Sequence, residues 1–286
     1  MDFVDAPLIQ SLLFGGHGLI ENGVRLGWTE TSNDTLSIAM EWLQGANSES
    51  FGTDGFDWNE ITISGADGAD LITAAVDATT IAGPFSLSGG ISAARGTRRL
   101  LRSDDMEDDH ETVWSAMQAM GETDPLMAEY GDSDLFGLRL QMAYMRSHES
   151  GIIITSEYLR RTINGTAFYE VESAILNRKQ AGWYASLVYQ MNHRWRAGIR
   201  HDRIQENRLA LDGSEIDLPE GMDRLTGMVE YHPDIPMRIR IQYSRDNAHW
   251  IDHIQHGYNA LIVQFTVFLG NHGGHNHHHE HDTCTH

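Results

Sequence analysis

Residues 237–245 place an apolar side chain at every second position and a polar or charged side chain between them. The apolar positions are Met237, Ile239, Ile241 and Tyr243, and the polar positions are Arg238, Arg240, Gln242 and Ser244. Because successive side chains of a β-strand point to opposite faces, this pattern predicts a strand with one apolar and one strongly polar face. Two folds accommodate such a strand: a soluble sheet with one wet face, and a membrane barrel with a water-filled interior.

The connections between segments of this kind distinguish the two folds. Alternation predicts eleven strands, at 24–30, 35–45, 70–81, 86–95, 134–146, 152–162, 183–191, 195–204, 224–232, 237–245 and 259–269. Short turns at 31–34, 82–85, 147–151, 192–194 and 233–236 alternate with long polar segments at 46–69, 96–132, 163–181, 205–223 and 246–257. A soluble sandwich gives no reason for this alternation, whereas outer-membrane barrels combine short periplasmic turns with long outer loops.

Strand length and the position of aromatic residues favour the same fold. Most of the predicted strands have about 9–11 residues, which is what a tilted strand needs to cross the hydrocarbon layer. Aromatic side chains stand near the strand ends, where interfacial girdles lie; they include Trp28, Trp42, Trp183, Trp195, Tyr231, Tyr243 and Tyr258. The sequence therefore predicts an all-β protein, an antiparallel transmembrane β-barrel with 11–12 strands in this chain, located in the cell outer membrane.

Composition narrows the surroundings of this barrel. The formal net charge of −21 argues against nucleic acid as a partner and against anchoring to anionic lipid heads. No apolar run approaches the length of a membrane helix, and the single cysteine, Cys284, excludes an internal disulfide. The first residues have neither a basic nor an apolar leader pattern, so we expect no signal peptide in this chain. The expected partners are outer-membrane lipid and a small ion or solute.

The predicted strand number has a consequence for the ends of the chain. Bacterial single-chain barrels normally have an even number of strands and both ends in the periplasm, so eleven strands leave one missing. Either the apolar run at 7–14 is a twelfth strand, or upstream strands precede Met1 in a larger even-stranded barrel, and we favour the second alternative. Residues 1–23 are then an extracellular loop segment left from a truncated barrel, 24–270 the barrel, and 271–286 a His-rich periplasmic tail.

Six segments of the chain resemble a family of proteobacterial, porin-like outer-membrane barrels often labelled zinc-regulated or TonB-dependent receptor-like. The segments are DFVDAPL at 2–8, GVRLGWTE at 23–30, GDSDLFGLRLQM at 131–142, GWYASLVYQMNHRWRAGIRHDRI at 182–204, RIRIQYSRD at 238–246 and LIVQFTVFLGNHGGH at 261–275. The resemblance implies a signal peptide and further strands before residue 2. This chain departs from the family at the C-terminus, where it continues as NHHHEHDTCTH. It also has no plug-like domain that would support coupling to TonB.

The polar faces of the predicted strands supply the candidate lumen residues. These are Arg25, Glu41, Arg139, Gln141, Glu157, Arg161, Arg196, Arg200, Arg238 and Arg240. Charge on the lipid side would cost about 2–4 kcal/mol near the bilayer midplane, so the alternation predicts that these side chains face water. Two interpretations stay open: an anion-attracting constriction, or arginine–glutamate pairs with Glu41, Glu157 and Glu230 that brace the wall.

The C-terminal tail is dense in histidine. The candidate metal ligands are His272, His275, His277, His278, His279 and His281. Neutral imidazole binds Zn, Cu and Ni, but the irregular spacing does not match a structural zinc site. The tail is interpreted either as a periplasmic collector of zinc or as a disordered segment with weak, incidental affinity.

Three functions compete at this stage. The sequence favours a passive or gated outer-membrane channel or receptor for zinc or another small ion or solute, with no enzymatic activity. The second is a soluble or periplasmic β protein whose tail buffers zinc. The third is a barrel enzyme, which would need a convergent Ser/His/acid group, whereas Ser186, His201 and Asp202 lie scattered in sequence.

Overall fold

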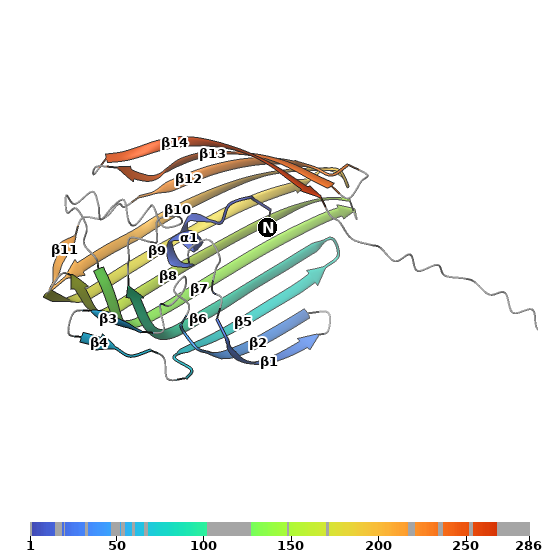
Figure 1. Ribbon diagram of the computed structural model, residues 1–286. Helices are drawn as coiled ribbons and strands as arrows, with labels where there is room; N and C mark the ends of the chain where they lie inside the picture. Colours follow the sequence, from blue (N-terminus) through green and yellow to red (C-terminus); the bar gives the residue numbers. More distant parts are fainter. Residues whose placement is uncertain are drawn as a thin grey trace, which may run out of the picture.

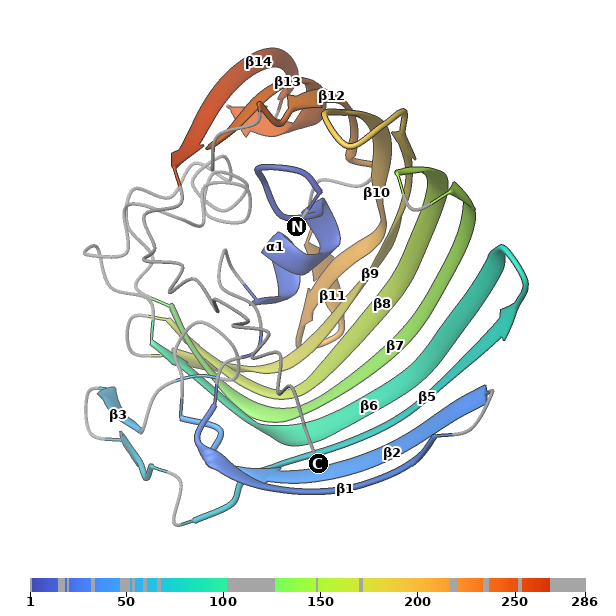
Figure 2. The ribbon, with the colours of Figure 1, turned by 90° about the vertical axis from the view of Figure 1, so that its right-hand side faces the viewer.

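The computed structural model consists of one large, curved antiparallel sheet with a short helix inside the curve (Figures 1 and 2). It describes residues 2–14, 19, 21–31, 34–46, 52, 55–58, 61–65, 68–101, 127–147, 149–169, 172–216, 221–233, 237–251 and 254–267. Within these ranges no helix is long and apolar enough to cross a bilayer.

Eleven strands form the sheet in the order β1-β2-β5-β6-β7-β8-β9-β10-β12-β13-β14, each antiparallel to its neighbours. Their bounds are β1 Gly23–Thr31, β2 Asp34–Leu43, β5 Leu71–Ala82, β6 Phe85–Leu101, β7 Met127–Ser147, β8 Ser150–Tyr169, β9 Glu172–Gln190, β10 Trp195–Leu211, β12 Asp223–Tyr231, β13 Met237–Ile251 and β14 Ile254–Val267. The smaller elements are α1 Leu8–Phe14, β3 Phe56–Trp58, β4 Ile61–Ile63 and β11 Ser214–Ile216. β3 pairs with β4, and β11 pairs with β10.

The antiparallel all-β fold predicted from alternation is confirmed, and so is every one of the eleven predicted strands. The prediction of long loops at 163–181 and 246–257 is wrong, because β8, β9 and β13 continue through most of these residues. The segment 205–223 is also largely strand, and β10 turns into β11 through Asp212 and Gly213, both with positive φ. An Asp-Gly pair is well suited to this left-handed conformation, which a two-residue hairpin requires.

The convex face of the sheet carries a wide belt of exposed apolar side chains. They occur on every strand of the sheet, and examples are Leu26 on β1, Ile38 on β2, Leu138 on β7, Leu187 on β9, Ile241 on β13 and Phe265 on β14. Register places Ile38, Val76, Ile91 and Leu138 side by side across four strands. A belt that crosses a whole sheet is far larger than the apolar patches of ordinary soluble monomers.

The belt ends where the apolar and polar residues of the strands exchange faces. Near the short turns of β10 the apolar Ile199 faces outward and Arg200 inward, but further along Arg203 is exposed and Ile204 is buried. β8 shows the same change, since Ile152 and Ile154 are exposed whereas Leu159 and Ile163 are buried. Beyond the belt the strands therefore have the apolar-inside pattern of a protein in water.

The N-terminal segment, defined here as residues 2–14, lies within the concavity of the sheet (Figure 2). α1 contacts β8, β9 and β10, and its Leu8, Ile9, Leu13 and Phe14 are buried with Ile204 in one apolar cluster. The alternative of a twelfth strand at 7–14 is wrong, because a short apolar run fits a buried helix turn as well as a strand.

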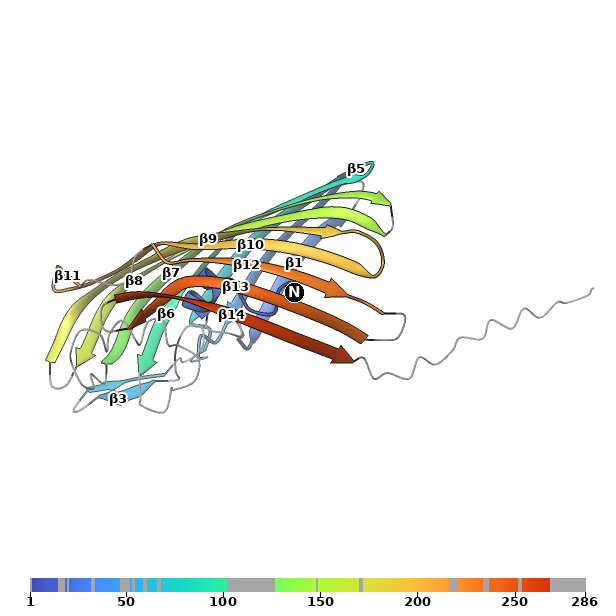
Figure 3. The same cartoon turned by 90° about the horizontal axis from the view of Figure 1, so that it is seen from above.

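The location of residues 1–23 as an extracellular loop segment stays a prediction. The chain enters β1 from the end of the sheet opposite the short turns, as expected, but residues 2–14 descend into the concavity and contact its wall. β1 and β14 form the two edges of the sheet, and in the described part of the chain they do not pair with each other (Figure 3).

Candidate functional site

Strand register places the ten predicted lumen residues on the concave face. Directly paired residues share a face, and one row across the sheet runs Arg25, Glu41, Thr73, Ala94, Leu135 and Arg161. Arg161 donates to the Leu13 carbonyl oxygen of the N-terminal segment at 2.7 Å, so this row faces the concavity. Two further rows place Arg139 beside Glu157, and Gln141 in line with Arg200. The charged positions therefore share the concave face, and their role as the lining of a lumen stays a prediction.

Near the short turns, one carboxylate on β12 joins the arginines of the two neighbouring strands. Glu230 on β12 is fully buried, and its Oε2 accepts from Arg240 Nε on β13 at 2.7 Å. Its Oε1 accepts from Arg196 Nη1 on β10 at 3.2 Å, and His232 Nε2 lies 2.7 Å from the same oxygen. Arg238 Nε is 3.9 Å from Oε2. For these arginines the bracing interpretation therefore describes the geometry, because their charge is neutralised in the wall.

A second carboxylate ties the N-terminal segment to the wall. Asp5 Oδ2 accepts from Arg224 Nη1 at 2.6 Å, and Asp5 Oδ1 accepts from Gln242 Nε2 at 2.7 Å. Arg200 Nη1 donates to the Asp5 carbonyl oxygen at 2.9 Å while its Nε donates to Asp202 at 2.8 Å. Asp202 in turn accepts from the Leu8 backbone N–H at the start of α1.

Other contacts hold the segment along its length. Arg196 also pairs with Asp2, Arg200 lies over the Phe3 ring with its guanidinium carbon 4.8 Å from the ring centroid, and Gln10 Nε2 donates to Glu157 at 2.6 Å. The strand residues that contact residues 2 to 13 lie in the same order along the sheet, from the short-turn end of the concavity towards the other end. The segment therefore spans most of the height of the sheet.

A third carboxylate, Glu129 on β7, lies beyond the belt on the side of the long connections. It is fully buried and accepts from Arg98 Nε at 3.3 Å and from Arg178 Nη1 at 3.0 Å. Burial lowers the pKa of the Arg98 guanidinium, and the neighbouring Glu129 carboxylate raises it in part. Charged pairs thus brace β6, β7 and β9 in this region as well.

The concave face of β1 to β7 is open in comparison. Arg25 is 69% exposed and Arg139 is 56% exposed, whereas Arg161, Arg200 and Arg240 are no more than 3% exposed. Arg139 Nη2 donates to Asp77 Oδ1 at 2.8 Å, and Arg25 Nη1 donates to Glu41 at 3.2 Å. The N-terminal segment covers one side of the concavity and leaves charged side chains accessible on the other.

A polar hollow of about 200 Å³ lies in this open wall, and Asp77, Arg139 and Glu157 are among its lining residues. Small residues make the space, since a Cβ on Gly90 would come within 2.1 Å of Asp77 Oδ1. Any larger residue at position 90 would therefore push the Asp77 carboxylate out of its place beside Arg139. The hollow is the best candidate for contact with a passing solute.

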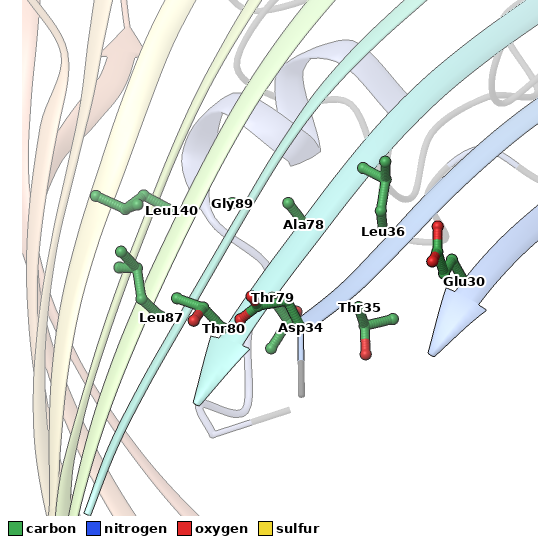
Figure 4. A pocket seen from close by; sticks show the side chains of 10 residues that line it. All are labelled: Glu30, Asp34, Thr35, Leu36, Ala78, Thr79, Thr80, Leu87, Gly89 and Leu140. Carbon is green, nitrogen blue, oxygen red and sulfur yellow. The ribbon is translucent and has the colours of Figure 1, made fainter. Parts of the chain in front are cut away.

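A larger hollow of about 460 Å³ is of a different kind. It lies near the β1–β2 and β5–β6 turns, where Leu36, Ala78, Gly89 and Leu140 form one row on the convex face (Figure 4). Small residues between two leucines leave a shallow groove in the apolar belt. Because it faces away from the concavity, it is not a solute site in the interior of the sheet.

Several sequence-based candidates lie elsewhere or outside the described residues. Ser186 and Asp202 face the concavity, but His201 faces outward with its ring centroid 5.3 Å from that of Trp183, so these three do not form a catalytic group. His272, His275, His277, His278, His279 and His281 lie outside the described residues, and zinc binding by the tail stays a prediction. Within the described ranges, no three His, Cys, Asp or Glu side chains form a metal site.

Sequence reasoning named Glu41 and Glu230 as partners of arginines, but it missed four other carboxylates that pair with them. Asp5, Asp77, Asp202 and Glu129 were not among the candidates, although Asp77 and Asp202 stand at inward positions of predicted strands. The phase of the alternation was a sufficient signal for these two. Asp5 carried no such signal, because it precedes the strands.

Comparison with known proteins gives few and distant relatives. No family model matches the sequence. A curated protein of uncharacterized function from Aquifex aeolicus (strain VF5) is 31% identical over 275 residues, which cover 96% of this chain and 55% of that protein. The chain thus spans about half the length of the curated relative it matches. These comparisons give no support to the zinc-regulated or TonB-dependent labels of the family that the sequence resembles.

Several solved structures align with most of this chain at low sequence identity. The toluene transporter TodX of Pseudomonas putida is 11% identical, with 85% of this chain and 72% of TodX covered and a TM-score of 0.38. The toluene transporter TbuX of Ralstonia pickettii is 10% identical, with 86% and 72% covered and a TM-score of 0.41. A FadL homologue of Pseudomonas aeruginosa is 11% identical, with 78% and 59% covered and a TM-score of 0.40. Similarity at this level carries no conclusion about activity or solute.

Proposed function

We propose that this chain forms part of the wall of an outer-membrane channel for small polar or charged solutes. The observation that carries the proposal is the division of the sheet into a continuous apolar belt outside and a row of charged residues inside. Buried arginines in the concavity are paired with carboxylates, so the wall is stable without exposing charge to lipid. A soluble zinc-buffering protein would have to cover the whole convex belt, which water does not solvate.

The passage runs between the N-terminal segment and the concave face of β1 to β7. The exposed ion pairs Arg25–Glu41 and Arg139–Asp77 lie along this side, and the hollow beside Asp77 widens it. Because both signs of charge are present and paired, the passage offers hydrogen bonds to polar solutes rather than a field of one sign. Zinc and other small ions remain candidates within this class.

TodX and TbuX are toluene transporters. An aromatic hydrocarbon would need an apolar lining, because uncompensated polar groups along a dry path lose their hydration. In this chain the hollow of the open wall has three charged lining residues, Asp77, Arg139 and Glu157, beside Ser92, two glycines, Ala75, Ile91 and Leu138. This lining favours a polar solute.

Membrane insertion is the first test of the proposed function. The full-length protein is expected to be extracted from membranes only with detergent. Its folded form is expected to migrate differently from its heat-denatured form on a gel, as is typical of membrane β-barrels. A lipid-facing charge serves as the internal check, since Leu138→Arg is expected to cost about 2–4 kcal/mol of folding free energy near the midplane. A monomer that stays soluble without any amphiphile would contradict the proposal.

Ion preference tests the position of the passage. Replacing Asp77 by asparagine removes a negative charge from the open wall and is expected to shift the reversal potential in a salt gradient towards anions, whereas Arg139→Gln is expected to shift it towards cations. Single-channel recordings in planar bilayers measure both. Asp134→Asn, on the convex face, is the matched control and should leave the reversal potential unchanged. Equal reversal potentials in all three variants would place the passage elsewhere.

A further inference from the structure

Basic side chains form a band on the convex face immediately beyond the apolar belt. The band consists of Arg160 on β8, Lys179 on β9, Arg203 on β10 and Arg245 on β13. Register shows that they share the outward face, because Arg160 is aligned with Phe136, Arg203 with Trp183, and Arg245 with Leu225. Arg160, Arg203 and Arg245 are exposed.

The band stands at one edge of the membrane-sized belt. Arg203 and Arg245 are the ninth residues of β10 and β13 counted from their short-turn ends, and Arg160 is the eleventh residue of β8. A tilted strand needs about 9–11 residues to cross the hydrocarbon layer. The reversal of alternation at Ile204 and Leu159 marks the same level independently. The guanidinium groups therefore stand at headgroup height on the side of the long connections.

Aromatic residues lie at the level of the band on the two strands that precede β10 in the sheet. Tyr158, Trp183 and Arg203 occupy one row across β8, β9 and β10, and Trp183 contacts His201 edge to face. Aromatic rings at the boundary of the hydrocarbon layer, with cations just outside it, are the arrangement that anchors a membrane protein against a charged lipid surface.

The arginines of the band differ from those of the concavity in their partners. Inside, Arg196, Arg200 and Arg240 each have a carboxylate within 3.2 Å. On the convex face, Arg160, Arg203 and Arg245 have no ion pair among the described residues. Two acids of the convex face lie near the band, but Asp134 Oδ1 lies 3.7 Å from Arg95 Nε, and Asp223 accepts from Asn247 instead of pairing with Arg203. Exposed cations concentrated at one level of a chain with a net charge of −21 call for an anionic partner from outside the chain.

We propose that the band binds the phosphate groups of lipids in the membrane leaflet at the long-connection end. The proposal rests on the proposed function, since it needs the belt to be embedded in a bilayer. It also qualifies the expectation, drawn from net charge, that anionic lipid heads are not partners. Net charge averages over the chain, whereas a lipid phosphate responds to the charges within about 10 Å of it. Arginine suits this task because its planar donors can bind two phosphate oxygens at once.

The test compares a phosphorylated glycolipid with the same lipid after removal of its phosphates, by native mass spectrometry of the full-length protein in detergent. The wild-type protein is expected to retain the phosphorylated lipid and to retain the dephosphorylated one far less. Arg160→Gln combined with Arg203→Gln is expected to weaken retention about 25-fold, because each basic residue near a charged lipid surface contributes about fivefold. Arg146→Gln combined with Arg194→Gln removes the same charge at the short-turn end and should change retention little.

Three results would overturn the inference. The first is equal retention of the two lipids, and the second is equal retention of the phosphorylated lipid by the wild type and the Arg160/Arg203 double variant. The third is displacement of the lipid by inorganic phosphate at equal phosphate concentration, which would indicate a site for free anions. Heat-modifiable migration of both double variants shows that they are folded. A protein that depends on detergent but has no phosphate selectivity contradicts this inference alone, whereas a detergent-independent protein contradicts the proposed function too.

Discussion

Replacing Glu230 by alanine is expected to destabilise the folded sheet by about 3–5 kcal/mol, the usual cost of removing one partner from a buried ion pair. Glu230 is fully buried and is the common acceptor of Arg196, Arg240 and His232, with Arg238 at the edge of the group. Its loss leaves Arg240, only 2% exposed, without a countercharge in a site that water reaches poorly. The free energy of unfolding in detergent, followed by tryptophan fluorescence against urea, measures the effect.

Two further variants separate charge from shape at this position. Glu230→Gln keeps the size and one acceptor oxygen, so it is expected to lose less than Glu230→Ala. Adding Arg240→Met to Glu230→Ala removes the unpaired cation and is expected to recover part of the lost stability. Glu30→Ala, an exposed glutamate on the edge strand, is the matched control and should change the free energy by less than about 0.5 kcal/mol. A Glu230→Ala variant as stable as the control would show that the group does not brace the wall.

The strands and their faces were predictable because the convex belt must be apolar along its whole height. Ile239, Ile241 and Tyr243 alternate with Arg238, Arg240 and Gln242, and this alternation alone predicts a strand with one apolar and one polar face. The phase of this pattern was sufficient to place all ten lumen candidates on the concave face. Single residues such as Asp77 could have been added by the same reasoning.

The outer thirds of the strands were missed for a physical reason. Beyond the belt, the outward position of β8 is the polar Asn164 and the inward position is the apolar Ile163. Within the belt the residue types are the other way round, with Ile154 outward and Thr155 inward. The apolar residues move from the outward to the inward positions, and this interruption of the pattern predicts a loop. The backbone pairing of β8 nevertheless continues to Tyr169. The change of phase marks a change of solvent and not the end of a strand.

The N-terminal segment and the identity of the ion-pair partners depend on contacts between residues far apart in sequence. Asp5 meets Arg224 and Gln242 across more than 200 positions, and nothing in the residues around Asp5 indicates such partners. The alternation shows which way a side chain points but not which residue it meets. For the same reason the choice between a selective constriction and a braced wall stayed open until the distances were known.

Reversing the charge of Asp5 is expected to release the N-terminal segment and raise the conductance of the channel. Asp5→Arg places a third guanidinium beside Arg200 and Arg224, and a like-charge contact of this kind costs several kcal/mol. The apolar side chains of α1 favour the bound position, but they are few: Leu8, Ile9, Leu13 and Phe14. The segment covers the concave face of β8 to β13, so its release adds that area to the passage. Single-channel recordings measure the change.

The controls for Asp5→Arg decide whether release or charge alone raises the conductance. Asp5→Asn loses the charge but keeps one acceptor oxygen for the donors of Arg224 and Gln242, so a smaller increase is expected. Asp34→Arg makes the same reversal at an exposed position on the rim and should leave conductance as it is. Cleavage by a protease added to the open channel is expected within residues 2–14 in Asp5→Arg only. Unchanged conductance together with unchanged cleavage would mean that α1 is held by its apolar contacts, and that the ion pairs of Asp5 only orient it.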